Sequence, residues 1–218
     1  MRPGKALRLL SRCYGENSLL KRRGFIFLCS HMRARTTLLS HIVGSHRSVC
    51  GYAELHQKLR GWPDLVELCA KAEDASGKTA AHHYVLDKIV HNLPIRQSIL
   101  DRDDTSLIIM VRDPLQTIRS ILEIKAGGID DLEGACDYYA ARLVALRELI
   151  GRRRGRVFYL DSEALLERTA VTLSALSHHL AIDPELSENY RLFKHTGKPK
   201  HGDMSENIRA GRIVHGQT

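Results

Sequence analysis

Residues 24–40 hold the residue types that bind phosphate, in the order that a phosphate site needs. An apolar run predicts a strand, a polar turn follows, and a helical pattern begins near Thr36. The first N–H groups of a helix lack intrahelical partners, so a strand, a tight loop and a helix start form an anion site. Arg33 and Arg35 add charge, and Thr36 and Thr37 add hydroxyl donors. The G-x-x-x-x-G-K-[ST] spacing is absent, so this is not a Walker A loop.

A second arginine stands at the end of another apolar strand. Residues 107–111 are all apolar and lead directly into Arg112. Pro114 predicts a helix start, where its missing N–H costs nothing, and Ser120 lies about two turns further along. A guanidinium fork suits a phosphate dianion and a hydroxyl adds a neutral donor. The alternative is that Arg112 pairs with Asp113 to cap the helix.

The first loop resembles the 5′-phosphosulfate loop of sulfotransferases, whose usual form is Arg-Ser-Gly-Thr-Thr-Leu-Leu. The matching residues are Arg33, Thr36, Thr37, Leu38 and Leu39. Ala34 and Arg35 stand where that pattern has Ser and Gly. Arg112 and Ser120 resemble the 3′-phosphate motif of the same family, an Arg at a strand end and a Ser eight residues later. The resemblance covers most of residues 24–183.

Residues 85–92 resemble the central sulfotransferase segment that carries a catalytic Lys, which Lys88 matches. In cytosolic members a His base follows two residues later, whereas His91 lies three residues after Lys88. Glu54 lies at a place comparable to that of a Glu base in tyrosylprotein and some bacterial sulfotransferases. The resemblance therefore leaves two candidate bases, Glu54 first and His91 second.

Two further segments match the family loosely. Lys198, Gly202 and Asp203 fit its C-terminal Arg-Lys-Gly-x-x-Gly-Asp segment, which closes on the 3′-phosphate of the cofactor. Residues 156–166 resemble its strand followed by Tyr-Glu-Asp-Leu, with Ser162 in place of the Tyr. We therefore expect the tail to be either a flap over the cofactor or a disordered end. An aromatic contact to adenine from position 162 is not expected.

The resemblance implies transfer of a sulfuryl group, without metal, from 3′-phosphoadenosine 5′-phosphosulfate (PAPS) to a hydroxyl or amine. The implied catalytic residues are Glu54, Lys88, His91 and Arg33. The implied cofactor-binding residues are Arg33, Ala34, Arg35, Thr36, Thr37, Leu38, Arg112, Ser120, Lys198 and Gly202. A base takes the acceptor proton, and the cations neutralise charge that develops on the bridging and sulfuryl oxygens.

Three alternatives remain open. A P-loop-type small-molecule kinase or NTPase would need Mg²⁺ and a Walker Lys, and neither that Lys nor a strand ending in a metal-holding Asp is evident. A nucleic-acid-binding protein is supported only by the net charge of +8. An inactive sulfotransferase-like binding protein stays possible because Arg35 and the spacing of His91 depart from the family.

The elements that must position these residues alternate along the chain. Strand patterns fall at 25–28, 83–86, 107–111 and 156–160. Helical patterns fall at 36–43, 62–72, 114–126, 132–150 and 163–180. This alternation predicts an α/β fold of three layers, a P-loop-like central parallel sheet flanked by helices. Ligands of such sheets bind beyond the carboxyl ends of the strands, where both arginine-bearing loops lie.

The composition is that of one globular domain over residues 1–218, with a basic N-terminal segment at 1–23 and a loop or tail at 195–218. The basic charge is scattered and the aromatic residues are sparse, so we expect no nucleic-acid partner. A phosphate-rich cofactor accounts for the charge equally well.

Five widely spaced cysteines without a C-x-x-C pair indicate neither a zinc site nor a disulfide framework. No apolar run approaches the ~18 residues of a membrane helix, and we expect a soluble, cytoplasmic protein. The short chain leaves little room for an acceptor lobe, which favours a small-molecule, lipid or sugar acceptor over a folded protein. A homo-oligomer is possible.

Overall fold

A five-stranded, all-parallel sheet forms the centre of the computed structural model, which describes residues 22–198 and 202–215. The strands are β1 (Gly24–Ser30), β2 (Val49–Cys50), β3 (Tyr84–Ile89), β4 (Thr105–Val111) and β5 (Val157–Asp161). Their order is β2-β3-β1-β4-β5. Because β1 lies between β3 and β4, the chain leaves the centre in both directions, and the crevice at this switch point is the usual ligand site of such sheets.

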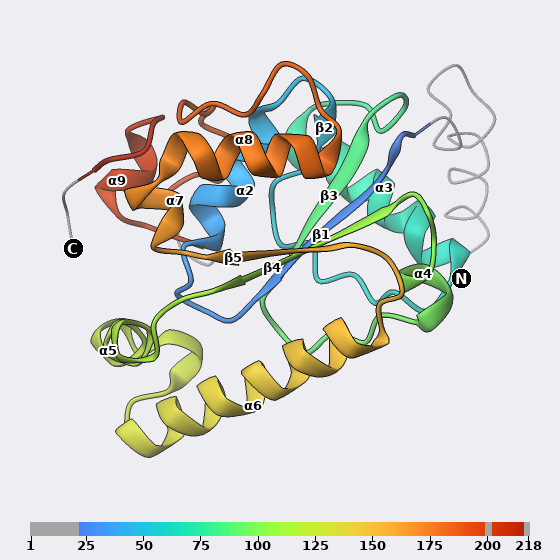
Figure 1. Ribbon diagram of the computed structural model, residues 1–218. Coiled ribbons are helices and arrows are strands. Elements are labelled where there is room, and N and C mark those ends of the chain that lie inside the picture. Colours follow the sequence, from blue (N-terminus) through green and yellow to red (C-terminus); the bar gives the residue numbers. More distant parts are fainter. Residues whose placement is uncertain (1–21, 199–201, 216–218) are drawn as a thin grey trace.

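Helices cover both faces of the sheet. They are α2 (Thr36–Ser45), α3 (Trp62–Ser76), α4 (Gln97–Leu100), α5 (Pro114–Ile124), α6 (Leu132–Arg152), α7 (Ala164–Glu167), α8 (Thr169–Leu180) and α9 (Glu206–Arg209), with a short 3₁₀ helix at Ala126–Gly128. Figure 1 shows α6 lying across one face and α8 on the opposite face. The predicted three-layer α/β fold is therefore confirmed.

The central strand β1 is buried along its whole length, because helices pack on both of its sides. Phe25, Phe27 and Cys29 join the core under α3, α4 and α6. Ile26 and Leu28 join the core under α2 and α8. A strand covered on both faces reads as a continuous apolar run, which is why this one was visible in the sequence.

Several elements differ from the sequence expectation. The strand β2 has only two residues, too few for a periodic pattern. The predicted helix 163–180 is two helices, because Arg168 has φ −130° and ψ 43° and interrupts the ladder between α7 and α8. The segment 195–218, expected to be a loop or tail, contains the short helix α9. These elements are short or set by single residues, which a windowed pattern does not resolve.

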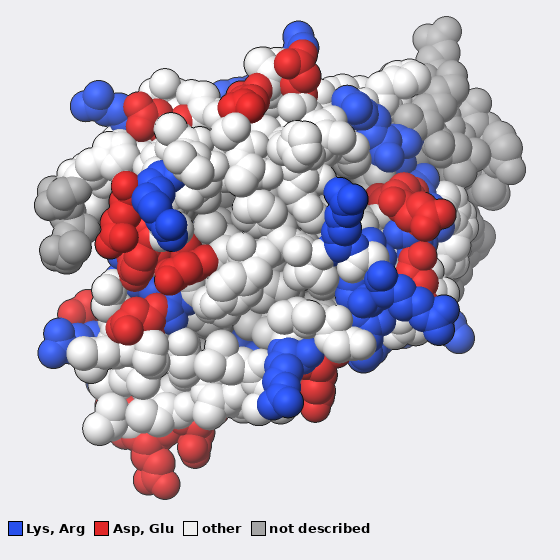
Figure 2. Space-filling view, in the orientation of Figure 1, with Lys and Arg blue, Asp and Glu red and all other residues white. Residues whose placement is uncertain are grey.

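Charge is not gathered into one continuous basic surface on the face shown in Figure 2, where Lys and Arg alternate with Asp and Glu around a wide neutral area. Within residues 22–198 and 202–215, none of the helices combines the length and the apolarity needed to cross a bilayer. Of the described cysteines, Cys29, Cys50 and Cys69 are buried thiols and Cys136 is exposed. Cys13 lies outside the described residues.

Candidate functional site

The carboxyl ends of β1, β3 and β4 meet at a cavity of about 490 Å³. Its lining residues are Met32, Arg33, Arg35, Thr36, Thr37, Glu54, Lys88, Val90, His91, Arg112, Ile124, Ala126, Gly127, Gly202, Asp203 and Ser205. Four of these are Lys or Arg and two are Glu or Asp, so the wall carries an excess of positive charge. The three predicted motifs, which are far apart in the sequence, thus share one cavity.

The loop between β1 and α2 bends sharply through two residues in the left-handed region. Arg33 has φ 64°, and Arg35 has φ 59° and stands at the N-cap of α2. Arg35 therefore keeps the backbone shape for which the sulfotransferase pattern uses Gly, at a cost of about 1 kcal/mol. No side chain among the described residues caps α2, so its first N–H groups face the cavity without a side-chain acceptor.

The side chain of Arg35 contacts the second departure from the family pattern. Its Nη1 donates to Ser162 Oγ at 3.1 Å and forms an ion pair with the Glu163 carboxylate. Ser162, which stands where the family has Tyr, is fully buried beneath this contact. The two substitutions are therefore neighbours in space.

Arg112 at the end of β4 is held by several groups around the cavity. Its Nη1 donates to Arg33 O at 3.1 Å and its Nη2 donates to Gln116 Oε1 at 2.7 Å. The Glu163 carboxylate lies 3.6 Å from its Nε. The backbone N–H of Arg112 donates to His31 Nε2 at 3.0 Å. These contacts fix the guanidinium before any ligand arrives.

The two predicted phosphate motifs are joined by a direct hydrogen bond. Arg33 Nε donates to Ser120 Oγ at 2.9 Å, which links the first loop to α5. Asp113 caps α5 by accepting from the Gln116 N–H at 2.9 Å, the role expected for a residue before Pro114. Ser120 is half-buried and is not among the residues that line the cavity, so it meets the site through Arg33.

Lys88 points from β3 toward the α2 side of the sheet and is 5 % exposed. Burial lowers the pKa of its ammonium, and the nearby Glu54, Asp87 and Asp203 carboxyl groups oppose that shift. Glu54 and Asp203 also line the cavity. An ammonium with little hydration interacts strongly with an anion that enters the same space.

The structure brings the two candidate bases together. Glu54 Oε1 lies 3.5 Å from His91 Nε2, and it also lies 3.8 Å from Nδ1 of His56. The Glu54 side chain is 15 % exposed, whereas the His91 and His56 side chains are 49 % and 62 % exposed. His56 was missed in the sequence because two loops, not one motif, create this cluster.

The C-terminal segment closes over the first loop. Gly202 has φ 101°, and a Cβ there would lie 2.5 Å from Thr37 Oγ1 and 3.3 Å from Lys88 Nζ. The Asp203 N–H donates to Thr37 Oγ1 at 3.2 Å. The positive φ favours glycine, and a side chain at this position would have to displace the Thr37 hydroxyl. Lys198, by contrast, is exposed and is not among the residues that line the cavity.

Ala34 and Leu38 do not reach the cavity with their side chains. Ala34 is fully buried beneath the loop. Leu38 lines a neighbouring hollow of about 110 Å³ that also includes Arg35 and Tyr190. Their part in the site is confined to the backbone of the loop and of the first turn of α2.

Side chains from α6 hold the loops from the other side, and the sequence analysis did not identify them. Tyr138 OH accepts from the Met32 N–H at 2.8 Å, and Tyr139 OH donates to Arg112 O at 2.8 Å. Arg142 Nε donates to Ser30 O at 2.7 Å. A mixture of Tyr and Arg on a helix resembles a solvated face, so its signal in the sequence was weak.

His31 is another positioning residue that the sequence did not reveal. Its Nε2 accepts from the Arg112 N–H, so its Nδ1 carries the proton and donates to Met32 O at 2.8 Å. Burial lowers the pKa of His31 to about 4, while the backbone hydrogen bond to Met32 opposes the shift. The neutral imidazole thus ties the first loop to the end of β4.

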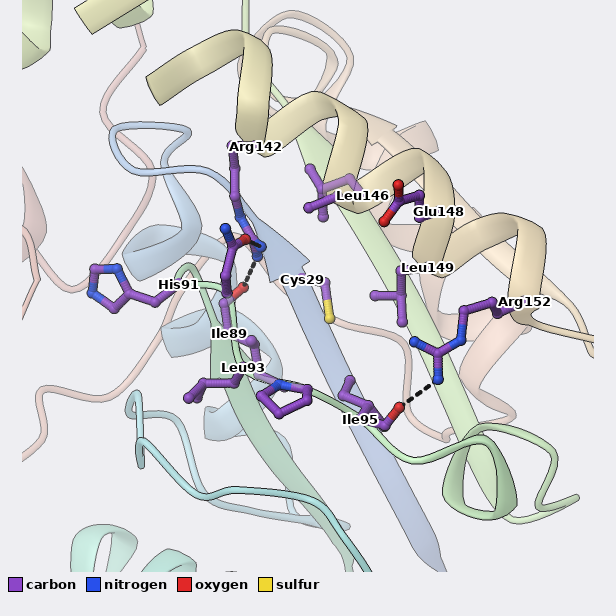
Figure 3. Close-up of a pocket in the computed structure, with 13 residues that line it drawn as sticks. Cys29, Ile89, His91, Leu93, Ile95, Arg142, Leu146, Glu148, Leu149 and Arg152 are labelled. Carbon is purple, nitrogen blue, oxygen red and sulfur yellow. Dashed lines mark hydrogen bonds between the residues drawn. The ribbon is translucent and has the colours of Figure 1, made fainter. Parts of the chain in front are cut away.

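A second cavity of about 330 Å³ lies between α6 and residues 91–96. Figure 3 shows Leu93, Ile95, Leu146 and Leu149 around it, with His91 at one end projecting away from them. His91 lines both this cavity and the larger one. An apolar hollow therefore adjoins the candidate bases.

No model of a known protein family matches the sequence, and no curated protein matches it significantly. Solved structures do match. A sulfotransferase domain from the curacin biosynthetic pathway superposes with a TM-score of 0.54 at 18 % identity, covering 89 % of this chain and 85 % of that one. Mouse sulfotransferase SULT7A1, complexed with PAP (3′-phosphoadenosine 5′-phosphate), superposes with a TM-score of 0.52 at 14 % identity, covering 74 % of this chain and 59 % of that one. The chain therefore has the fold of sulfotransferases.

Proposed function

We propose that the protein is a sulfotransferase that uses PAPS as its sulfuryl donor. The observation that carries the proposal is the single cationic cavity formed by Arg33, Arg35, Lys88 and Arg112 at the switch point of the sheet. A nucleotide that carries a 3′-phosphate and a 5′-phosphate group needs two separate groups of cations within one cavity. The sulfotransferase fold and the PAP bound in the mouse neighbour support the same choice.

The residues present fit such a donor. The start of α2 and the hydroxyl groups of Thr36 and Thr37 would hold its 5′-phosphate. Arg112 and Ser120 would hold its 3′-phosphate, with Arg33 between the two ends. Gly202 leaves room beside Thr37 and Lys88 for the chain to close over the donor. Holding both ends would align the sulfur for in-line attack.

The chemistry of the reaction requires one base and one or more cations. When bound, PAPS supplies a sulfuryl group whose bond to the 5′-phosphate oxygen breaks as the bond to the acceptor oxygen forms. Glu54 or His91 would take the acceptor proton. Lys88 would neutralise the oxygen that departs with the electron pair, and its burial strengthens that interaction.

We further propose that the acceptor is a small alcohol with an apolar body that lies in the cavity of Figure 3. Arg142 and Arg152 there already donate to the backbone carbonyl groups of Ile89 and Ile95, which leaves mainly the apolar wall for a ligand. Leu149→Glu should raise KM for lipid-like alcohols at least about tenfold and leave PAP affinity unchanged. Equal KM values in both proteins would refute this assignment.

Calorimetric titration with PAP in the absence of Mg²⁺ tests the donor site. The wild type should bind PAP, and Arg112→Ala should weaken binding about 30-fold, because one charge-assisted pair is lost. Arg119→Ala is the control, since Arg119 is exposed on α5, the helix that follows Arg112. Absence of PAP binding, or preferential binding of ATP with Mg²⁺, would favour the kinase alternative.

A further inference from the structure

We propose that Glu54, His56 and His91 form a binding site for one divalent transition-metal ion of the Zn²⁺ class. One ligand atom from each residue lies within 4.8 Å of the other two. Glu54 Oε1 is 3.5 Å from His91 Nε2 and 3.8 Å from His56 Nδ1. Three ligands placed about 2.1 Å from a tetrahedral ion lie about 3.4 Å apart, so the two distances to Glu54 need little adjustment. The two histidine nitrogens, which lie within 4.8 Å of each other, reach this spacing by rotation of their exposed rings.

The Glu54 carboxylate provides the second observation. Its Oε1 is buried, and within the part of the chain that the structure describes it has no hydrogen-bond partner. A buried carboxylate oxygen without a donor is costly, whereas a cation between it and two imidazoles would satisfy it. The unpartnered atom is the one that faces both histidines.

The two imidazoles supply an entry path and the freedom to adjust. The side chains of His56 and His91 are 62 % and 49 % exposed, so each can rotate toward the ion. Figure 3 shows the His91 ring projecting away from the apolar cavity, and its Nε2 lies 3.5 Å from Glu54 Oε1. Their ring centroids are 5.7 Å apart.

The donor set indicates the class of ion. Two imidazole nitrogens and one carboxylate oxygen suit Zn²⁺ and its neighbours in the first transition row, rather than Mg²⁺ or Ca²⁺, which prefer oxygen. Three protein ligands leave a fourth position for water. Because Glu54 and His91 are also the candidate bases, a bound ion would withdraw them from proton transfer. This consequence, unlike the site itself, rests on the proposed function.

Co²⁺ is the probe for the test, because its visible absorption reports nitrogen and oxygen ligation directly. The full-length protein, freed of metal by a chelator, is titrated with CoCl₂ and then with ZnCl₂ in competition. We expect one equivalent to bind. His56→Asn should weaken affinity at least about 30-fold, since even the loss of an outer partner of a metal ligand costs about 10- to 100-fold. Asn suits the site because His56 has φ 48°.

His215→Asn is the matched control. His215 and Glu188 form an exposed pair at 3.2 Å of the same two residue types, and no third His, Cys, Asp or Glu among the described residues completes a group with them. Its Co²⁺ affinity should equal that of the wild type. Thermal unfolding is used to check that the wild type and His56→Asn are both folded. Equal Co²⁺ affinity of the two proteins would then overturn the proposal. The same samples are also titrated with PAP, which tests the proposed sulfotransferase function separately. Failure to bind PAP would count against that function and would leave the Co²⁺ result unaffected.

Discussion

Two ends of the cavity are built in opposite ways: the proposed donor end, with Arg33, Arg35 and Arg112, and the proposed reactive end, with Glu54, Lys88, His91 and the adjacent Asp87. At the donor end every arginine is engaged by protein groups: Arg33 by Ser120, Arg35 by Glu163, and Arg112 by Gln116. At the reactive end, Glu54 Oε1 and Asp87 Oδ2 are buried and have no hydrogen-bond partner among the described residues. At the donor end Arg112 Nε and Glu163 Oε1 also lack one, but these two atoms lie 3.6 Å apart as an ion pair.

Lys88 lies beside these carboxyl groups with its ammonium almost fully desolvated. The donor end is thus held in place by side-chain contacts and keeps more arginines than carboxylates, while the reactive end buries carboxyl oxygens that no hydrogen bond satisfies. Buried ionisable groups of this kind are typical of functional sites, where stability is given up for chemistry.

The largest effect is expected at the reactive end. Lys88→Met should lower the conversion of radiolabelled PAPS to PAP, with water or an added alcohol as acceptor, by about 10²- to 10³-fold. PAP affinity should fall much less than turnover, because Lys88 meets only the one 5′-phosphate oxygen that departs, whereas the other phosphate contacts are assigned to the donor end. Lys58→Met, at an exposed lysine, is the control. A large loss of PAP affinity without a loss of turnover would reverse the two assignments.

The buried carboxyl group of Asp87, at the reactive end, should make the stability of the protein depend on pH. Burial raises the pKa of Asp87 to about 7, while a hydrogen bond from the Leu55 N–H opposes the shift. The folded state therefore binds a proton that the unfolded state has released between pH 4 and pH 7, and stability falls as pH rises through that window.

Asp87→Asn removes this dependence. The unfolding free energy of the variant relative to the wild type should rise by about 3 kcal/mol from pH 4.5 to pH 8, as measured by urea denaturation. Asp103→Asn, at an exposed carboxylate, should show no such trend. A difference that stays constant with pH would mean that Asp87 is not held protonated by burial.

The smallest effect is expected at the donor end. Glu163 pairs with Arg35 and lies 3.6 Å from Arg112, so its charge opposes that of an incoming phosphate. Glu163→Gln should tighten PAP binding about threefold, because both cations become less neutralised while Arg35 keeps an acceptor. Glu167→Gln, at an exposed site on α7, is the control. Weaker binding would show that Glu163 serves to position the arginines.

The donor end was largely predictable because its parts are local. The strand β1, the loop with Arg33 and the start of α2 are contiguous, and burial on both faces gave β1 a continuous apolar pattern. The same holds for β4, Arg112 and α5. Their mutual contact through Ser120 required only that two neighbouring strands end at one edge.

The reactive end was predictable only in part. Lys88 follows from its strand, but Glu54, His56 and His91 come from two loops with no periodic pattern. Their proximity depends on how residues 51–61 run beside the end of β3, and sequence spacing does not encode that path. The expectation of a reaction without metal came from the family resemblance, and the cluster of Glu54, His56 and His91 has no spacing motif because its residues come from separate loops.

Comparison of PAP with AMP tests the central claim most directly, because the two nucleotides differ only by the 3′-phosphate. Titration without Mg²⁺ should show that the wild type binds PAP at least about 30-fold more tightly than AMP. In Arg112→Ala this ratio should fall close to one, because the group that reads the 3′-phosphate is gone. Equal affinity of the wild type for PAP and AMP would contradict the account, since no part of the cavity would then recognise a sulfuryl donor of this class.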